Sequence, residues 1–176
     1  MKFNNIKKSN LIIYTIFFII LAYSLFVFFY MIPKDIHHEF IGIRFQAGNT
    51  NLIEPVLIKV EGTYKRKSFM SNDFNKFEGT IMIDGEKSYS DIWDHTKFNV
   101  FKFNNNKMAS IVNNNFEGHL FIDNMMKEIT ILIYHEDKTG FDFKSGWLIS
   151  GPASTREQAV TITNDLISET YGRSIE

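Results

Sequence analysis

The densest group of side chains that could do chemistry lies at residues 91 to 95, within the stretch YSDIWDHTK of residues 89 to 97. If this stretch formed a helical turn, Asp91 would share a face with Asp94 or His95, and such a pair could bind a divalent cation. Trp93 would offer a small ligand an aromatic surface. Asp91, Trp93, Asp94 and His95 are therefore the candidate ligand-binding residues, although a solvated loop anchored by its apolar residues is the commoner outcome.

A second candidate for chemistry is a motif that occurs three times: VEGTY at 60 to 64, FEGTIMIDG at 77 to 85 and FEGHLFIDN at 116 to 124. Three converging carboxylates could bind a cation. On strands, however, Glu61, Glu78 and Glu117 fall on the face opposite the apolar residues. The glycine after each Glu falls on the apolar face, where it makes room for an aromatic ring or lets the strand bend. We expect three similarly built strands rather than a metal site.

The remaining histidines lie in HHE, at residues 37 to 39, and in HEDK, at 135 to 138. His37 and His38 would point to opposite faces of a strand and could not share one metal ion. The second group, with Asp142 nearby, offers acid and base groups, but catalysis would need them held in a cleft. The sequence contains no GxSxG, HExxH, P-loop or GxGxxG motif. It predicts no catalytic residue, no metal site and no cofactor.

Composition excludes several classes of function. The 19 basic and 20 acidic side chains nearly cancel, which argues against a nucleic-acid-binding protein. The absence of cysteine excludes disulfides, thiolate sites and a lipid-modified cysteine. Lys59 and residues 65 to 67 form a basic patch that could contact anionic lipids or wall polymers. Such a patch more often belongs to a solvent-exposed edge strand, on which lysines discourage aggregation.

Residues 11 to 32, LIIYTIFFIILAYSLFVFFYMI, carry no charge and are long enough to form a transmembrane helix. The first ten residues contain three lysines and no acid, so the positive-inside rule places residues 1–10 in the cytoplasm. Residues 33–176 would then lie outside, making a single-pass signal-anchor protein of the cell membrane. A cleaved signal peptide is the alternative, but it would have a shorter apolar region and small residues at the cleavage site.

After Pro33 the pattern becomes alternating, as in β-strands. Strands are expected at 40–45, 55–66, 77–83, 97–103, 107–113, 116–122, 128–135 and 146–150, separated by turns rich in Asn, Asp and Gly. This order predicts an antiparallel β-meander that forms a sandwich or a barrel. The fold class is therefore mainly β.

The C-terminal region is expected to be an amphipathic helix over 154–170, ending near Gly172. Ser154 and Glu157 have the spacing of a capping box. Apolar side chains then recur at helical spacing, at Ala159, Val160, Ile162, Leu166 and Ile167. We expect this stripe to pack on an open face of the sheet, with docking of a partner as the alternative.

These expectations favour a non-catalytic binding or assembly module at the outer face of the membrane. It would be held in the lipid bilayer by residues 11–32 and would meet an envelope protein or a wall polymer. The alternatives are a metal-dependent envelope hydrolase that uses the Asp91, Asp94 and His95 region, and a subunit of a membrane complex whose span packs on other helices. A concave pocket lined by Asp94, His95 and another acid would favour the hydrolase.

Overall fold

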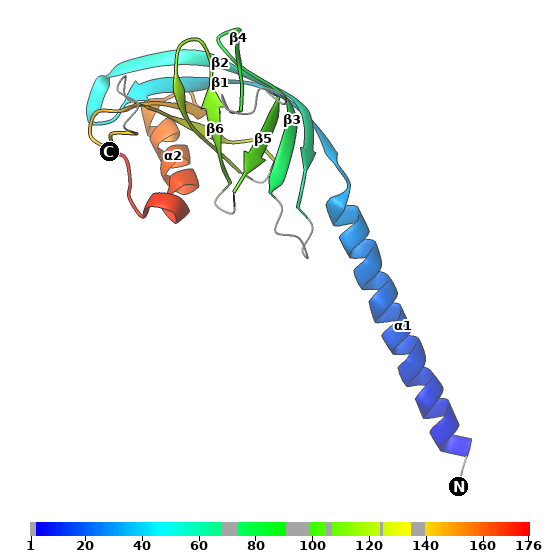
Figure 1. The fold of residues 1–176 in the computed structure, drawn as a ribbon. Coiled ribbons are helices and arrows are strands. Elements are labelled where there is room, and N and C mark those ends of the chain that lie inside the picture. Colours follow the sequence, from blue (N-terminus) through cyan, green and yellow to red (C-terminus); the bar gives the residue numbers. More distant parts are fainter. Residues whose placement is uncertain (1–2, 68–73, 91–98, 105–106, 124, 135–139) are drawn as a thin grey trace. The chain divides into compact units, whose positions relative to one another are not determined.

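A computed structural model describes residues 3–67, 74–90, 99–104, 107–123, 125–134 and 140–176 (Figure 1). The chain divides into two compact units, Met1–Ile32 and Pro33–Glu176. The first unit is the helix α1 (Phe3–Met31), which begins within the residues predicted as a short tail. Its segment Ile12–Met31 is long and apolar enough to cross a membrane, and none of it is buried in the structure. A signal sequence would have the same properties.

In its described residues, the second unit is built on nine antiparallel strands. They are β1 (Lys34–Gln46), β2 (Asn49–Lys65), β3 (Asn75–Ile83), β4 (Glu86–Ser88), β5 (Val100–Phe103), β6 (Met108–Val112), β7 (Glu117–Ile122), β8 (Ile129–Ile133) and β9 (Trp147–Gly151). The helix α2 (Arg156–Tyr171) follows them. The mainly β fold with a C-terminal helix is therefore confirmed.

The sheet has the order β4-β3-β2-β1-β9-β8-β7-β6, and β5 pairs separately with β3. Two meanders, β1 to β4 and β6 to β9, are thus joined through their first and last strands. The hydrogen bonds between neighbouring strands do not close the described sheet into a complete barrel. One isolated bridge links its two ends, where Tyr89 and Val112 exchange backbone hydrogen bonds of 2.7 and 2.9 Å.

Two differences from the predicted strands have a simple cause. The first strand begins at Lys34 rather than at residue 40. Its polar stretch KDIHHE pairs only with β2, and one face of this antiparallel pair is exposed to solvent, so polar residues can form a strand there. The prediction also missed β4, a three-residue strand of polar sequence EKS. It forms because the tight turn at Asp84 and Gly85, both with positive φ, returns the chain along β3.

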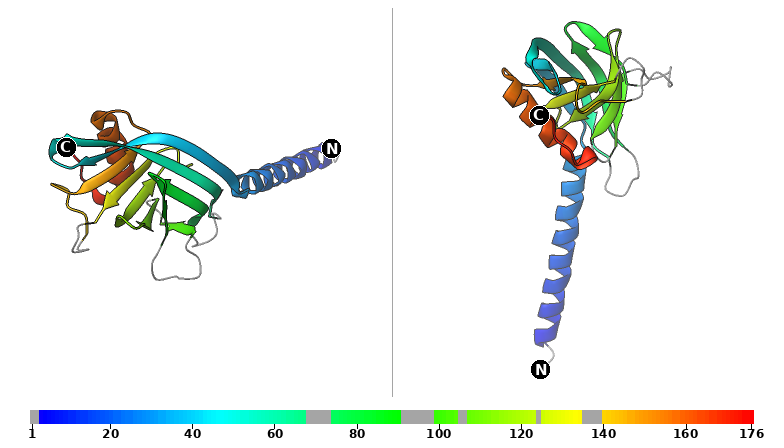
Figure 2. Two further views of the ribbon diagram at one scale, coloured as in Figure 1. Left: turned by 90° about the horizontal axis from the view of Figure 1, so that it is seen from above. Right: turned by 90° about the vertical axis from the view of Figure 1, so that its left-hand side faces the viewer.

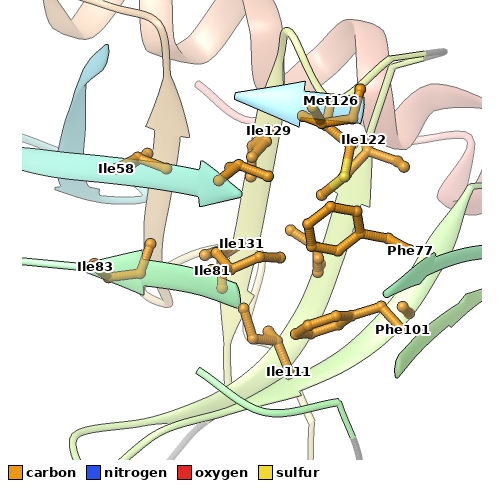
Figure 3. Close-up of a cluster of buried hydrophobic side chains, with 14 of the residues drawn as sticks. Ile58, Phe77, Ile81, Ile83, Phe101, Ile111, Ile122, Met126, Ile129 and Ile131 are labelled. Carbon is orange, nitrogen blue, oxygen red and sulfur yellow. The ribbon is translucent and has the colours of Figure 1, made fainter. Parts of the chain in front are cut away.

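The sheet has an apolar cluster on each of its two faces. In the first cluster, isoleucines and phenylalanines from β2, β3 and β5 meet those from β6, β7 and β8, with Phe77 and Phe101 among the fully buried rings (Figure 3). The second cluster lies between the other face and α2, which contacts β1, β7, β8 and β9 (Figure 2). The strands β7 to β9 are buried on both faces, which explains their nearly continuous apolar sequence.

The repeated motif has the architectural role that its pattern predicts. Gly62 on β2 lies directly opposite Gly79 on β3. A Cβ atom at Gly79 would lie 2.7 Å from the ring of Phe77, and one at Gly62 would lie 2.9 Å from it. The paired glycines therefore leave the space in which the buried ring of Phe77 packs. In the third copy, a Cβ atom at Gly118 would instead collide with the carbonyl oxygen of Leu132 on the neighbouring strand.

The cap of α2 differs from the predicted one by one residue. Thr155, not Ser154, is the N-cap, and its hydroxyl accepts a 3.3 Å hydrogen bond from the backbone N–H of Gln158. The side-chain oxygen of Gln158 in turn accepts from the backbone N–H of Ser154 at 2.9 Å. The pair Thr155 and Gln158 thus replaces Ser154 and Glu157, because Thr and Gln satisfy the same capping pattern. The helix ends at Gly172, as predicted, with a φ of 58°.

The apolar stripe of α2 packs on the sheet as expected. Ala159 and Ile167 are buried, and Val160, Ile162 and Leu166 pack beside them. Thr163 is also buried, and its hydroxyl accepts a 3.4 Å hydrogen bond from Thr130 of β8.

The residues after α2 fold back along it. Ile175 is 3% exposed and belongs to the cluster beneath the helix. The side-chain amide of Asn164 accepts from the backbone N–H of Ile175 at 2.7 Å and donates to its carbonyl oxygen at 3.1 Å. Arg156 donates to the main-chain oxygen of Glu176 at 2.6 Å. The tail is therefore part of the packed unit.

Candidate functional site

The predicted ligand-binding residues Asp91, Trp93, Asp94 and His95 lie outside the described residues, as does the group at 135 to 138. The site at Asp91 to His95 therefore remains a prediction. The three motif glutamates occupy separate places: Glu78 forms an ion pair of 2.7 Å with Lys65, Glu61 lies on β2, and Glu117 lies on β7. In the described part of the chain, no three His, Asp or Glu side chains are placed to hold a metal ion.

The polar side chains near the start of β1 are separated by the pleat of the strand, as expected. His37 is exposed, whereas a ring nitrogen of His38 lies 3.2 Å from the carbonyl oxygen of Met125. The interpretation of the basic patch as an edge strand is wrong, since β2 pairs with β1 on one side and with β3 on the other. Its lysines also pair with acids: Lys59 lies 2.9 Å from Glu39, and Lys65 forms the ion pair with Glu78.

A pocket of about 140 Å³ opens where β1, β8 and β9 come together. It is lined by Gln46, Ile133, Tyr134, Asp142, Ser145, Gly146 and Trp147. Gln46 and Trp147 face each other in the ladder of β1 and β9, and Tyr134 directly follows β8. The side chains therefore come from strand ends, whose positions the sheet determines.

The fourth wall of the pocket is a turn over residues 142–146. The carboxylate of Asp142 accepts from the hydroxyl of Ser145 and, at 2.9 Å, from the backbone N–H of Lys144. The N–H of Gly146 donates to the carbonyl oxygen of Asp142 at 2.7 Å, which closes the turn. The side chain of Gln46 donates to the carbonyl oxygen of Ser145 at 2.8 Å. Local hydrogen bonds thus hold this wall against β1.

Tyr134 links the pocket to a half-buried histidine. Its hydroxyl lies 2.5 Å from Nε2 of His119 on β7, and Nδ1 of His119 lies 3.2 Å from the hydroxyl of Tyr171 at the end of α2. A neutral imidazole has one N–H donor and one acceptor nitrogen, so one tyrosine donates to the ring and the other accepts from it.

Burial keeps this chain of three groups uncharged. It lowers the pKa of His119 below the ordinary value of 6.5. Burial raises the pKa of Tyr134 and the pKa of Tyr171. The nearby Tyr171 and Glu117 raise the pKa of Tyr134 further. The hydroxyl of Tyr134 is directed at His119, on the face of the sheet that α2 covers.

Sequence reasoning missed this site because its parts have no characteristic spacing. They lie at 46, at 133–134 and at 142–147 in the sequence, and the pairing of β1 with β9 brings them together. One signal is present in the sequence, since Asp142 lies near the acid and base groups at 135 to 138. The structure instead gives the Asp142 carboxylate hydrogen bonds within its own turn.

No protein-family model, curated protein or solved structure matches this chain.

Proposed function

We propose that this chain is a single-pass membrane protein whose β-domain, residues 33–176, lies outside the cytoplasm and acts as a non-catalytic binding or assembly module. The observation that carries the proposal is the exposed apolar helix. Segment Ile12–Met31 has no buried side chains, and an apolar surface of that length needs lipid or another protein around it. Ile32 and Pro33 join α1 to β1 along the chain.

The orientation rests on the charges that flank the helix. Lys2, Lys7 and Lys8 precede the apolar segment, and the first ten residues contain no acid. Positive flanks are retained on the cytoplasmic side during insertion. The β-domain then meets an envelope protein or a wall polymer on the other side.

Binding is favoured over catalysis by the character of the pocket. Its walls are strand ends and a turn that is closed by local hydrogen bonds. In ligand sites, a few polar groups held in place fix the orientation of the ligand.

Labelling of single cysteines tests the orientation, because the natural chain has no cysteine to give a background. Leu52→Cys places a thiol at a side chain of the β-domain that is 42% exposed. Asn5→Cys places one before the apolar segment. We expect a membrane-impermeant maleimide to label Leu52→Cys in intact cells and Asn5→Cys only after lysis. The reverse pattern would contradict the proposed orientation.

A tag at the N-terminus separates an anchor from a cleaved signal. An anchor keeps the tag and the β-domain on one polypeptide, which stays in the membrane fraction after alkaline extraction. A shortened, extractable β-domain without the tag would show cleavage and contradict the anchor.

A further inference from the structure

We infer that the pocket between Gln46, Tyr134, Asp142 and Trp147 binds a neutral ring that bears several hydroxyl groups, of the size of one sugar unit. This inference rests on the proposed function as a binding module and names the class of its ligand. It does not depend on which side of the membrane the domain faces.

The volume of the pocket fits a single ring. At about 140 Å³, it is close to the cavity volume of about 150 Å³ that accommodates one benzene molecule. A six-membered sugar ring fills a similar space, and its outer hydroxyls would extend through the open mouth. A longer polymer would present one unit or one chain end to this pocket.

The lining combines one large aromatic surface with several hydrogen-bonding groups. Trp147 remains 38% exposed although it lies on a strand of the sheet. Tyr134, Asp142 and Gln46 also line the pocket. An aromatic ring can cover the apolar C–H face of a sugar while polar side chains bond its hydroxyls.

The charges at the pocket favour a neutral ligand. Of the described residues that line it, Asp142 is the one with a formal charge, and none is Lys, Arg or His. A phosphate or carboxylate would be repelled by Asp142 and would find no cation among these side chains. The Asp142 carboxylate already accepts hydrogen bonds from Ser145 and Lys144, so a cationic ligand is not required to satisfy it.

The pocket is also held in shape before any ligand arrives. The N–H of Ala47 donates to the carbonyl oxygen of Gly146 at 2.9 Å, which joins the turn to the end of β1. The hydrogen bond to His119 fixes the side chain of Tyr134. A preorganised site loses little conformational entropy on binding, and this favours recognition even by a small ligand.

Ligand-observed saturation-transfer NMR on the full chain tests the inference. The protein is kept in amphipol, which carries neither sugar nor choline. The probes are glucose and N-acetylglucosamine, with tetramethylammonium and inorganic phosphate as the charged comparisons. We expect saturation of the ring protons of at least one sugar. Trp147→Ala should weaken that binding by about tenfold.

Phe74→Ala is the matched control, since Phe74 is another exposed aromatic of the domain and does not line the pocket. It should bind sugar as the natural chain does, and near-UV circular dichroism should show that all variants remain folded. The inference is overturned if neither sugar receives saturation, if Trp147→Ala binds normally, or if tetramethylammonium or phosphate displaces the sugar.

The two proposals fail separately. A chain that binds sugar but has its Leu52→Cys thiol in the cytoplasm retains the pocket inference and loses the proposed location. A correctly oriented chain that binds neither sugar loses only the pocket inference.

Discussion

The hydroxyl of Tyr134 lies 2.5 Å from Nε2 of His119, so a half-buried imidazole is held between β7 and the residue that follows β8. The other ring nitrogen pairs with Tyr171 at 3.2 Å, which adds the end of α2 to the same group. One side chain on β7 thus contacts both the end of the neighbouring strand β8 and the end of α2. The stability of this junction should depend on the protonation of His119.

The first prediction concerns pH. Burial lowers the pKa of His119 below 6.5, so the unfolded chain takes up this proton before the folded chain does. The contribution of the neutral imidazole is present above the unfolded value and is lost as the pH falls through the lowered folded value. The free energy of unfolding of the natural chain should therefore decrease in acid more than that of His119→Gln. Urea unfolding of the full chain between pH 8 and pH 5 measures the difference.

His37→Gln is the control for that titration, because His37 is exposed on β1. Its unfolding curve should follow that of the natural chain at every pH. At pH 8, His119→Gln should be less stable by about 1 kcal/mol for its lost hydrogen bonds. Parallel pH profiles for His119→Gln and the natural chain would refute a role of His119 in the acid dependence.

The second prediction concerns the facing glycines. Gly79→Ala would place a Cβ atom 2.6 Å from the Cα atom of Gly62 and 2.7 Å from the ring of Phe77. The buried ring has little room to move, so the substitution should destabilise the domain by about 1–3 kcal/mol. Chemical unfolding followed by near-UV circular dichroism measures the loss.

Thr80→Ala provides the comparison, since it changes the next residue of β3, whose side chain lies on the opposite, wetter face. It should change stability by less than about 0.5 kcal/mol. If Gly79→Ala were as stable as Thr80→Ala, the glycine pair would not be needed for the packing of Phe77.

The third prediction concerns the tail that folds back on α2. Asn164→Ala removes both hydrogen bonds to the backbone of Ile175. It should lower stability by about 1–3 kcal/mol, because the N–H of Ile175 loses its partner. Cleavage by a carboxypeptidase should also become faster, since the tail is released more often. Mass spectrometry of the digested chain gives the rate of removal.

Asp165→Ala, one position along the same helix and exposed, should leave both the stability and the digestion rate nearly unchanged. Ile175→Ala should reproduce the faster digestion by removing the buried side chain of the tail. Equal digestion rates for Asn164→Ala and Asp165→Ala would show that the amide of Asn164 does not retain the tail.

Much of the fold could be predicted because the sequence patterns have a direct physical meaning. Alternation along 55–66 and 77–83 matches β2 and β3, and apolar residues at helical spacing match α2. The three-residue strand β4 lacks enough side chains to show alternation. The cap at Thr155 was missed because Ser154 and Thr155 are both good N-caps, each followed three residues later by Glu or Gln.

The pocket could not be predicted in the same way. Gln46 and Trp147 become neighbours only because β1 pairs with β9, and a single sequence does not state which strands pair. Strand alternation predicts that His119, two residues after Glu117, shares the solvent-exposed face, whereas the structure shows it half-buried and 3.2 Å from the hydroxyl of Tyr171. Local patterns indicate the direction of a side chain, but its surroundings depend on the tertiary structure.

The pairing of β1 with β9 also has a consequence for the order of folding. Synthesis produces β1 first among the strands and β9 last, yet residues 43–46 cannot complete their ladder until residues 147–150 are available. The hairpin of β1 and β2 can form early from local contacts, whereas the centre of the sheet must wait for nearly the whole domain. A nascent chain would therefore keep Ile43 and Phe45 uncovered during synthesis, and any factor that protects unfinished chains would find its target on this hairpin.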